Sequence, residues 1–115
     1  MTIFFKQDDM TPENRSSIKN IILDTHAYDI ETFEENCTFF NEKLKEIFIW
    51  FDNLINDRKI ALIALCFILG LKNVIEMEKI ITYLYQQKFI DAGRELKKLG
   101  YEKIANLISC VDLIY

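Results

Sequence analysis

Histidine and cysteine are the residues of this chain that most often carry catalysis or bind metals, and both are scarce. His26 is the only histidine, and no cysteine or second histidine stands at the spacing of a zinc ligand. A nucleophilic thiol needs a base and an exposed, electropositive setting. Cys37, Cys66 and Cys110 instead stand among apolar residues of expected helices. We therefore expect buried, reduced cysteines, a loop or capping role for His26, and no bound metal or cofactor.

A short aromatic segment is the strongest candidate for binding. The segment consists of four consecutive residues, Phe48, Ile49, Trp50 and Phe51. Such a cluster serves a buried core, but aromatic side chains at a helix end are also typical anchors of a protein–protein interface. Phe48, Trp50 and Phe51 are therefore the candidate partner-binding residues, and the partner that we expect is another protein.

The elements that position these residues are expected to be helices. The chain of 115 residues has three Gly and one Pro, so it lacks the residues that form tight hairpins. Thr11, Pro12 and Glu13 form a capped helix start. Apolar spacing predicts an all-α bundle of about five or six helices, near 12–24, 30–51 (with an alternative end near 48), 58–69, 74–87, 90–99 and 102–113. We expect one domain over 1–115, with 1–10 as an arm or short strand.

The hydrophobic core is expected to surround one helix. Residues 60–69 are apolar on every face, which predicts a buried central helix at about 58–69. Gly70 and Gly100 are placed to end helices, Gly70 in the left-handed conformation. The spacing predicts these inward-facing positions: Ile18, Ile21, Ile22, Ile30, Phe33, Cys37, Phe40, Leu44, Ile47, Phe51, Met77, Ile80, Ile81, Leu84, Ala92, Leu96, Leu99, Ile104, Leu107, Ile108 and Val111.

Charge and hydropathy exclude several classes of partner. The net charge of −4 disfavours nucleic acid, which requires a basic face. Residues 1–57 carry a balance of −7 and residues 58–115 a balance of +3, so an acidic face for a basic partner and chance clustering both remain open. The longest apolar run has ten residues, too few to span a bilayer. Without a secretory signal at the N-terminus, we expect a soluble, cytoplasmic protein.

The second half of the chain resembles the helical lobe of the phage-type lysozymes. Five residues stand at the positions of that family's buried central helix: Arg58, Ala61, Leu62, Phe67 and Gly70. Residues 86–96 are similar to the family's polar turn, aromatic, acid, small residues and Glu-Leu, and Tyr101 falls near the aromatic that closes the lobe. The resemblance covers roughly 30–115 and implies a lysozyme-like helical lobe of phage or mobile-element origin.

The catalytic lobe of that family is not recognisable. Its enzymes place a catalytic Glu near the N-terminus, followed by an Asp and a Thr in a glycine-rich sheet, whereas this chain has no Gly before Gly70. Glu13, Asp24 and Thr25 echo the family's Glu, Asp and Thr, with a Glu-to-Asp interval that is longer by two residues. If the chain is an enzyme, the resemblance implies a peptidoglycan muramidase that uses Glu13 and Asp24.

Three functions remain open at this point. The favoured one is a non-catalytic, lysozyme-like helical protein that binds, inhibits or assists another protein. The second is a reduced muramidase, whose substrate would be peptidoglycan. The third is a death-fold-like interaction module, because residues 96–108 resemble the last helices of death-fold domains, which assemble through charged faces.

Overall fold

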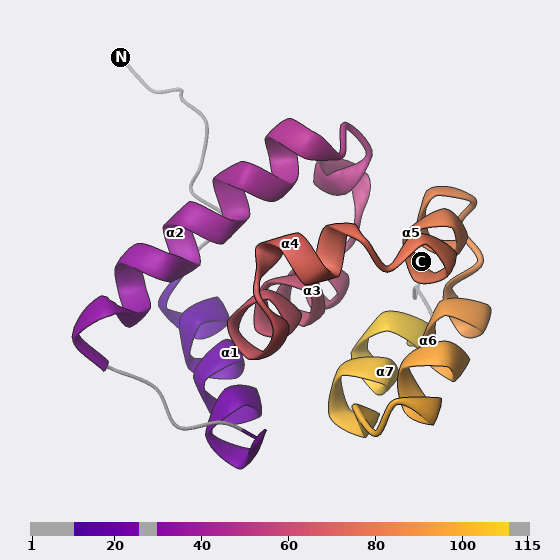
Figure 1. Ribbon diagram of the computed structural model, residues 1–115. Helices are drawn as coiled ribbons and strands as arrows, with labels where there is room; N and C mark the ends of the chain where they lie inside the picture. The colour runs from indigo at the N-terminus through magenta and orange to yellow at the C-terminus, as the bar shows by residue number, and fades with distance from the viewer. Residues whose placement is uncertain (1–10, 26–29, 111–115) are drawn as a thin grey trace, which may run out of the picture.

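The computed structural model describes residues 11–25 and 30–110, with the side chains at 23–25, 30 and 31 outside the described part. The described residues contain no strand, which confirms the all-α class (Figure 1). The expected arm or strand at 1–10 lies outside them. The helices are α1 (Pro12–Thr25), α2 (Ile30–Ile47), the 3₁₀ turn η1 (Phe51–Asn53), α3 (Asn56–Leu69), α4 (Leu71–Ile75), α5 (Glu78–Tyr85), α6 (Phe89–Lys98) and α7 (Glu102–Ser109).

The first helix begins where its capping residues predict. The backbone N–H of Asn14 donates to Thr11 Oγ1 at 3.2 Å, which satisfies one of the unpaired donors of the first turn. The buried Asn14 side chain exchanges two hydrogen bonds with Asn56, of 2.9 and 2.6 Å, at the start of α3. These bonds fix the first turn of α1 against the first turn of α3.

Aromatic packing joins α2 to α3. The ring of Phe67 on α3 stacks on Phe33 with centroids 5.3 Å apart, and meets Phe40 edge-on at 5.1 Å. Leu44 continues the buried stripe of α2. Ile47 was expected to face inward as well, but it is 42% exposed. The expectation is wrong because α2 ends at Ile47 and the chain leaves the helical path there.

Helix α3 lies among its neighbours and is buried from Arg58 to Cys66. It packs against α1, α2, α4 and α7, and Figure 1 shows it between the two ends of the molecule. Gly70 follows its last residue as expected, with φ of +91° and ψ of 147°. The expected left-handed helical conformation is wrong, because this ψ is extended; the positive φ still favours glycine.

The expected helix at about 74–87 is divided between two helices, α4 and α5. The described residues therefore contain seven α-helices, and the expected total of five or six is wrong. The turn between them is closed by the backbone N–H of Glu78, which donates to the carbonyl of Glu76 at 2.9 Å. Val74 and Ile80 are both buried. In one straight helix their side chains would point about 120° apart, because each turn takes 3.6 residues. The break lets both reach the core.

The close crossing of α6 and α7 depends on Gly93. A Cβ atom on Gly93 would lie 2.8 Å from Ser109 Cβ and 3.0 Å from the Ala105 carbonyl oxygen. Helix α6 ends before Gly100, as expected, in a Schellman turn with φ of +94°. Leu99 was expected to be buried but is 56% exposed, because this turn carries it away from the buried stripe of α6.

We predict that Gly93→Val lowers the free energy of unfolding by about 1–3 kcal/mol, because the added atoms overpack a contact between rigid backbones. Urea unfolding followed by circular dichroism measures the change. Gly93→Ala serves as a smaller probe, and it should destabilise a Ser109→Gly background less than the native chain. Equal urea midpoints for the Gly93→Val variant and the native chain would refute this account of the crossing.

Candidate functional site

The two candidate catalytic carboxyls stand at opposite ends of one helix. Glu13 is exposed in the first turn of α1, and Asp24 and Thr25 belong to its last turn. The side chains of Asp24 and Thr25 lie outside the described residues. Eleven residues of α-helix separate the Cα atoms of Glu13 and Asp24 by about 16 Å. Glycosidases hold their two carboxyl groups roughly 5–9.5 Å apart. The path of α1 therefore does not favour a catalytic pair.

The most elaborate polar arrangement surrounds Arg58 in the first turn of α3. Its side chain is buried, and Nε donates to the carbonyl of Ile108 at 2.7 Å. One terminal nitrogen donates to the carbonyl of Cys110 at 2.6 Å. The guanidinium carbon lies 3.6 Å from the ring centroid of Phe89, which is a cation–π contact. Arg58 thus satisfies carbonyls at the end of α7 and stacks on the start of α6.

A cavity of about 390 Å³ opens beside this arginine, lined by Phe89, Ser109 and Cys110 among others. Two hydrogen bonds of Arg58 run to backbone carbonyls and its face is covered by Phe89, so these contacts form a structural clamp between helices. From the sequence, Arg58 was assigned only to the lysozyme-like pattern. The signal for its role was a cation in the first turn of a helix that is apolar from Ile60 onward, a signal that Lys59 shares.

The aromatic segment after α2 is divided between core and surface. Phe51 is fully buried and has no surface to offer a partner. Phe48 and Trp50 are half-buried, and their rings stack with centroids 4.8 Å apart. Ile49 between them is 87% exposed. Phe48 and Trp50 therefore stay partner-binding candidates, and the exposed apolar side chain that they flank is Ile49.

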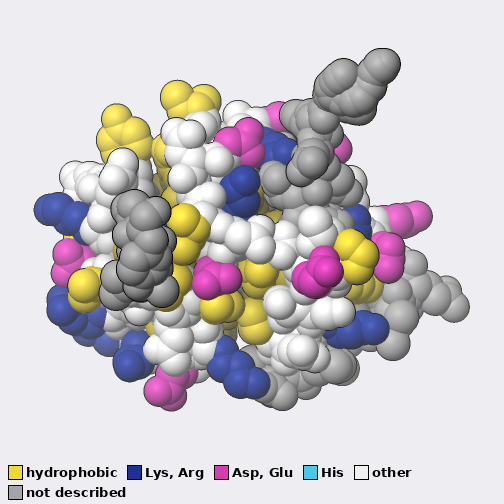
Figure 2. Space-filling view, turned by 180° about the vertical axis from the view of Figure 1, so that it is seen from behind, with side chains coloured by type: hydrophobic (Ala, Val, Ile, Leu, Met, Phe, Trp, Pro, Cys, Tyr) yellow, Lys and Arg dark blue, Asp and Glu magenta, His cyan; other side chains and the backbone are white. Residues whose placement is uncertain are grey.

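A second element brings another aromatic residue to this surface. A hollow of about 130 Å³ is lined by Trp50 and Leu54 on one side and by Tyr85 at the end of α5 on another. Tyr85 is 66% exposed. Figure 2 shows hydrophobic side chains projecting from the upper edge of the molecule in that view. We name Phe48, Ile49, Trp50 and Tyr85 the aromatic surface. Sequence spacing could not group Tyr85 with Trp50, because 35 residues separate them.

The cysteines divide by burial. Cys66 is buried, and burial raises the pKa of its thiol to about 12. Burial also raises the pKa of Cys37, to about 11, against a smaller opposing effect of Arg15. Cys110 was expected to be buried but is only half-buried, because it follows the last residue of α7. Its Sγ lies 3.1 Å from the carbonyl of Leu107.

Other kinds of site find little support in the described part of the chain. No three His, Cys, Asp or Glu side chains there gather as metal ligands would. His26 lies outside it. Among the helices described, none combines the length and apolar character needed to cross a bilayer.

Comparison of the chain with protein families, with curated proteins and with solved structures finds no match. The function therefore has to be argued from the surfaces and side chains of this structure.

We predict that Arg58→Met lowers the free energy of unfolding by about 3 kcal/mol, since it leaves two carbonyls without their charged donor. Arg58→Lys should cost less, because an ammonium keeps one bond but loses the planar fork and its stacking on Phe89. Arg94→Met, at an exposed arginine of α6, is the matched control and should change stability by less than about 0.5 kcal/mol. Equal losses for Arg58→Met and Arg94→Met in urea unfolding would contradict the clamp.

The reactivity of the three cysteine thiols should follow their burial. At about pH 8 we expect a disulfide reagent to modify Cys110 first, and Cys37 and Cys66 only after unfolding, because the thiolate is the reacting form. The reaction is followed by absorbance of the released thiolate, with Cys110→Ser as the control that removes the fast phase. Three equally fast thiols in the folded protein would show that the helices do not protect the two buried ones.

Proposed function

We propose that this chain is a non-catalytic helical module that binds another protein through the aromatic surface. The observation that carries the proposal is the 87% exposure of Ile49, which stands between Phe48 and Trp50 in the sequence while the rings of those two residues stack on each other. A stacked pair of aromatic rings next to one protruding aliphatic side chain has the form of an interface anchor. Tyr85, across the hollow from Trp50, widens the area that a partner can cover.

The charges beside this surface indicate what the partner offers. Asp52 lies 3.8 Å from the ammonium of Lys59 and 3.9 Å from that of Lys45, so this nearby carboxylate is already paired within the chain. Affinity at this surface would then come from apolar burial, which is worth about 1.5–3 kcal/mol for a side chain such as Ile49. The partner that fits is a protein with an apolar pocket, and its binding should depend little on salt.

The lysozyme-like ancestry belongs to the same proposal. It is supported by the order of Arg58, Ala61, Leu62 and Phe67 along α3 with Gly70 after it, while the absence of Gly before Gly70 argues against a retained catalytic lobe. A helical lobe kept without its catalytic lobe is a scaffold available for binding, inhibiting or assisting a protein, and the resemblance implies a phage or mobile-element origin. The death-fold alternative would use charged faces instead, and salt dependence separates the two.

The test is affinity capture from the native host with three baits: the native chain, Ile49→Asp and Leu99→Asp. Both variants place a carboxylate at an exposed aliphatic position, but Leu99 lies away from the aromatic surface. We expect the native chain and Leu99→Asp to capture the same protein, and Ile49→Asp to lose it. With the purified partner, Ile49→Asp should raise Kd at least about tenfold at low and at high salt.

Two results would overturn the proposal. One is equal binding of the captured partner by the native chain and Ile49→Asp. The other is lysis of purified peptidoglycan, followed by turbidity, that the Glu13→Gln variant abolishes, because it would identify a muramidase. A chain without muramidase activity should leave the turbidity unchanged whether or not Glu13 is replaced.

A further inference from the structure

A groove between α6 and α7 is separate from the aromatic surface. It has a volume of about 300 Å³, and its lining includes Ile90, Gly93, Arg94, Lys97 and Asn106 but no carboxylate. Ile90 is 64% exposed. Figure 2 shows several Lys and Arg side chains, with Asp or Glu among them, along the left edge of that view, the side on which α6 and α7 lie. The groove therefore presents one exposed apolar side chain, Ile90, and two cations, Arg94 and Lys97, on the same surface.

The cations of the groove keep donors for a partner. Arg94 holds one ion pair, with Asp91 of its own helix at 2.9 Å, and the two side chains are 61% and 41% exposed. An exposed pair of this kind contributes little, and a guanidinium has five N–H donors. The nearby carboxylate of Glu95 is engaged elsewhere, by Lys98 at 3.2 Å and Lys79 at 3.5 Å. The hydrogen bond from Lys98 is the main reason that the pKa of Glu95 is lowered.

The outer face of α2 carries the complementary pattern. Glu35, Phe39, Glu42 and Glu46 follow one another at intervals of four, three and four residues, and all are exposed. Phe39 is 48% exposed, although an aromatic ring of this size is usually covered. Lys43 beside them lies 3.6 Å from Glu46. We name Phe39, Glu42 and Glu46 the acidic stripe.

The acidic stripe and the groove match in spacing and in charge. Glu46 lies seven positions after Phe39, and Lys97 lies seven positions after Ile90, which is about 10 Å of helix in each case. We propose that the acidic stripe of one copy of this chain packs into the α6–α7 groove of a second copy. Phe39 then covers Ile90, and the two glutamates meet Arg94 and Lys97, with α2 and α6 running parallel.

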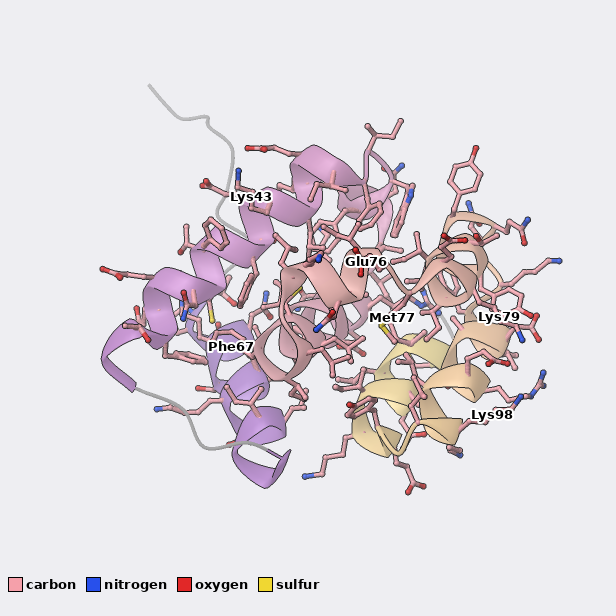
Figure 3. The ribbon with its side chains drawn as sticks, viewed as in Figure 1. Lys43, Phe67, Glu76, Met77, Lys79 and Lys98 are labelled. Carbon is pink, nitrogen blue, oxygen red and sulfur yellow. The ribbon has the colours of Figure 1, made fainter. Side chains whose placement is uncertain are left out.

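This contact joins different molecules head to tail. Helices α2 and α6 lie on opposite sides of the molecule (Figure 1), and Figure 3 shows Lys43 and Lys98 far apart in the same way. The two surfaces of one chain therefore do not reach each other. Because they differ, a copy that is bound through one still presents the other, and the contact propagates as a chain of copies. It uses neither Ile49 nor Trp50, so it stands apart from the proposed function.

Sedimentation equilibrium of the native chain is the first test. We expect the average mass to rise with protein concentration at about 0.01 M salt, where the Debye length is about 30 Å. At about 1 M salt, where this length falls to about 3 Å, the mass should return toward that of one chain. A single-chain mass at every concentration in low salt would overturn the proposal, as would association that salt leaves unchanged.

Charge reversal identifies the surfaces. R94E/K97E makes the groove acidic and E42K/E46K makes the stripe basic, so each variant alone should associate at least tenfold more weakly. An equimolar mixture should associate again, because the acidic stripe of the first fits the basic groove of the second and the reverse pair also matches. K72E/K88E carries the same charge change as R94E/K97E outside the groove and should behave as the native chain does. A mixture that stays monomeric, or a control that loses association, would refute the contact.

Discussion

The arrangement of the helices depends on one buried cation. Arg58 stands at the start of α3, and it bonds to carbonyls that lie 50 and 52 residues further along the chain. Burying a charge is costly unless it is hydrogen-bonded, so the carbonyls at the end of α7 and the ring of Phe89 help α3 to be buried at Arg58. At the same end of α3, Asn56 holds the first turn of α1. One end of one helix thus fixes both halves of the molecule.

The two exposed surfaces follow from this core. Because the inner face of α2 packs on α3, its glutamates and Phe39 have to face outward. Because α2 stops at Ile47, the next four residues turn sharply, and Phe51 enters the core while Ile49 points away from it. Apolar residues on every side of that turn cannot all be buried by one core. Exposure of an aliphatic side chain here is therefore a consequence of the turn.

The sequence pattern correctly predicted features that are determined by residues close together in the chain. The cap at Thr11, the buried stripe of α2 from Phe33 to Leu44 and the stop at Gly100 depend on neighbours in sequence, and these are as expected. The break between α4 and α5 depends on where α3 lies relative to Val74 and Ile80, which spacing does not contain. For the candidate site, the segment 48–51 was identified, but its division into buried Phe51 and exposed Ile49 required the direction of the turn. The place of Tyr85 beside Trp50 could be seen only in the tertiary fold.

The sequence distance that Arg58 bridges also bears on how the chain folds. Helices α5, α6 and α7 pack on their immediate neighbours through short turns, so their contacts close small loops and form quickly. The clamp closes a loop of about 50 residues and cannot form until α7 has an end to bind. Helices α6 and α7 thus form a surface on which α3 packs, and the hydrogen bonds of Arg58 join these parts into one cooperative folding unit.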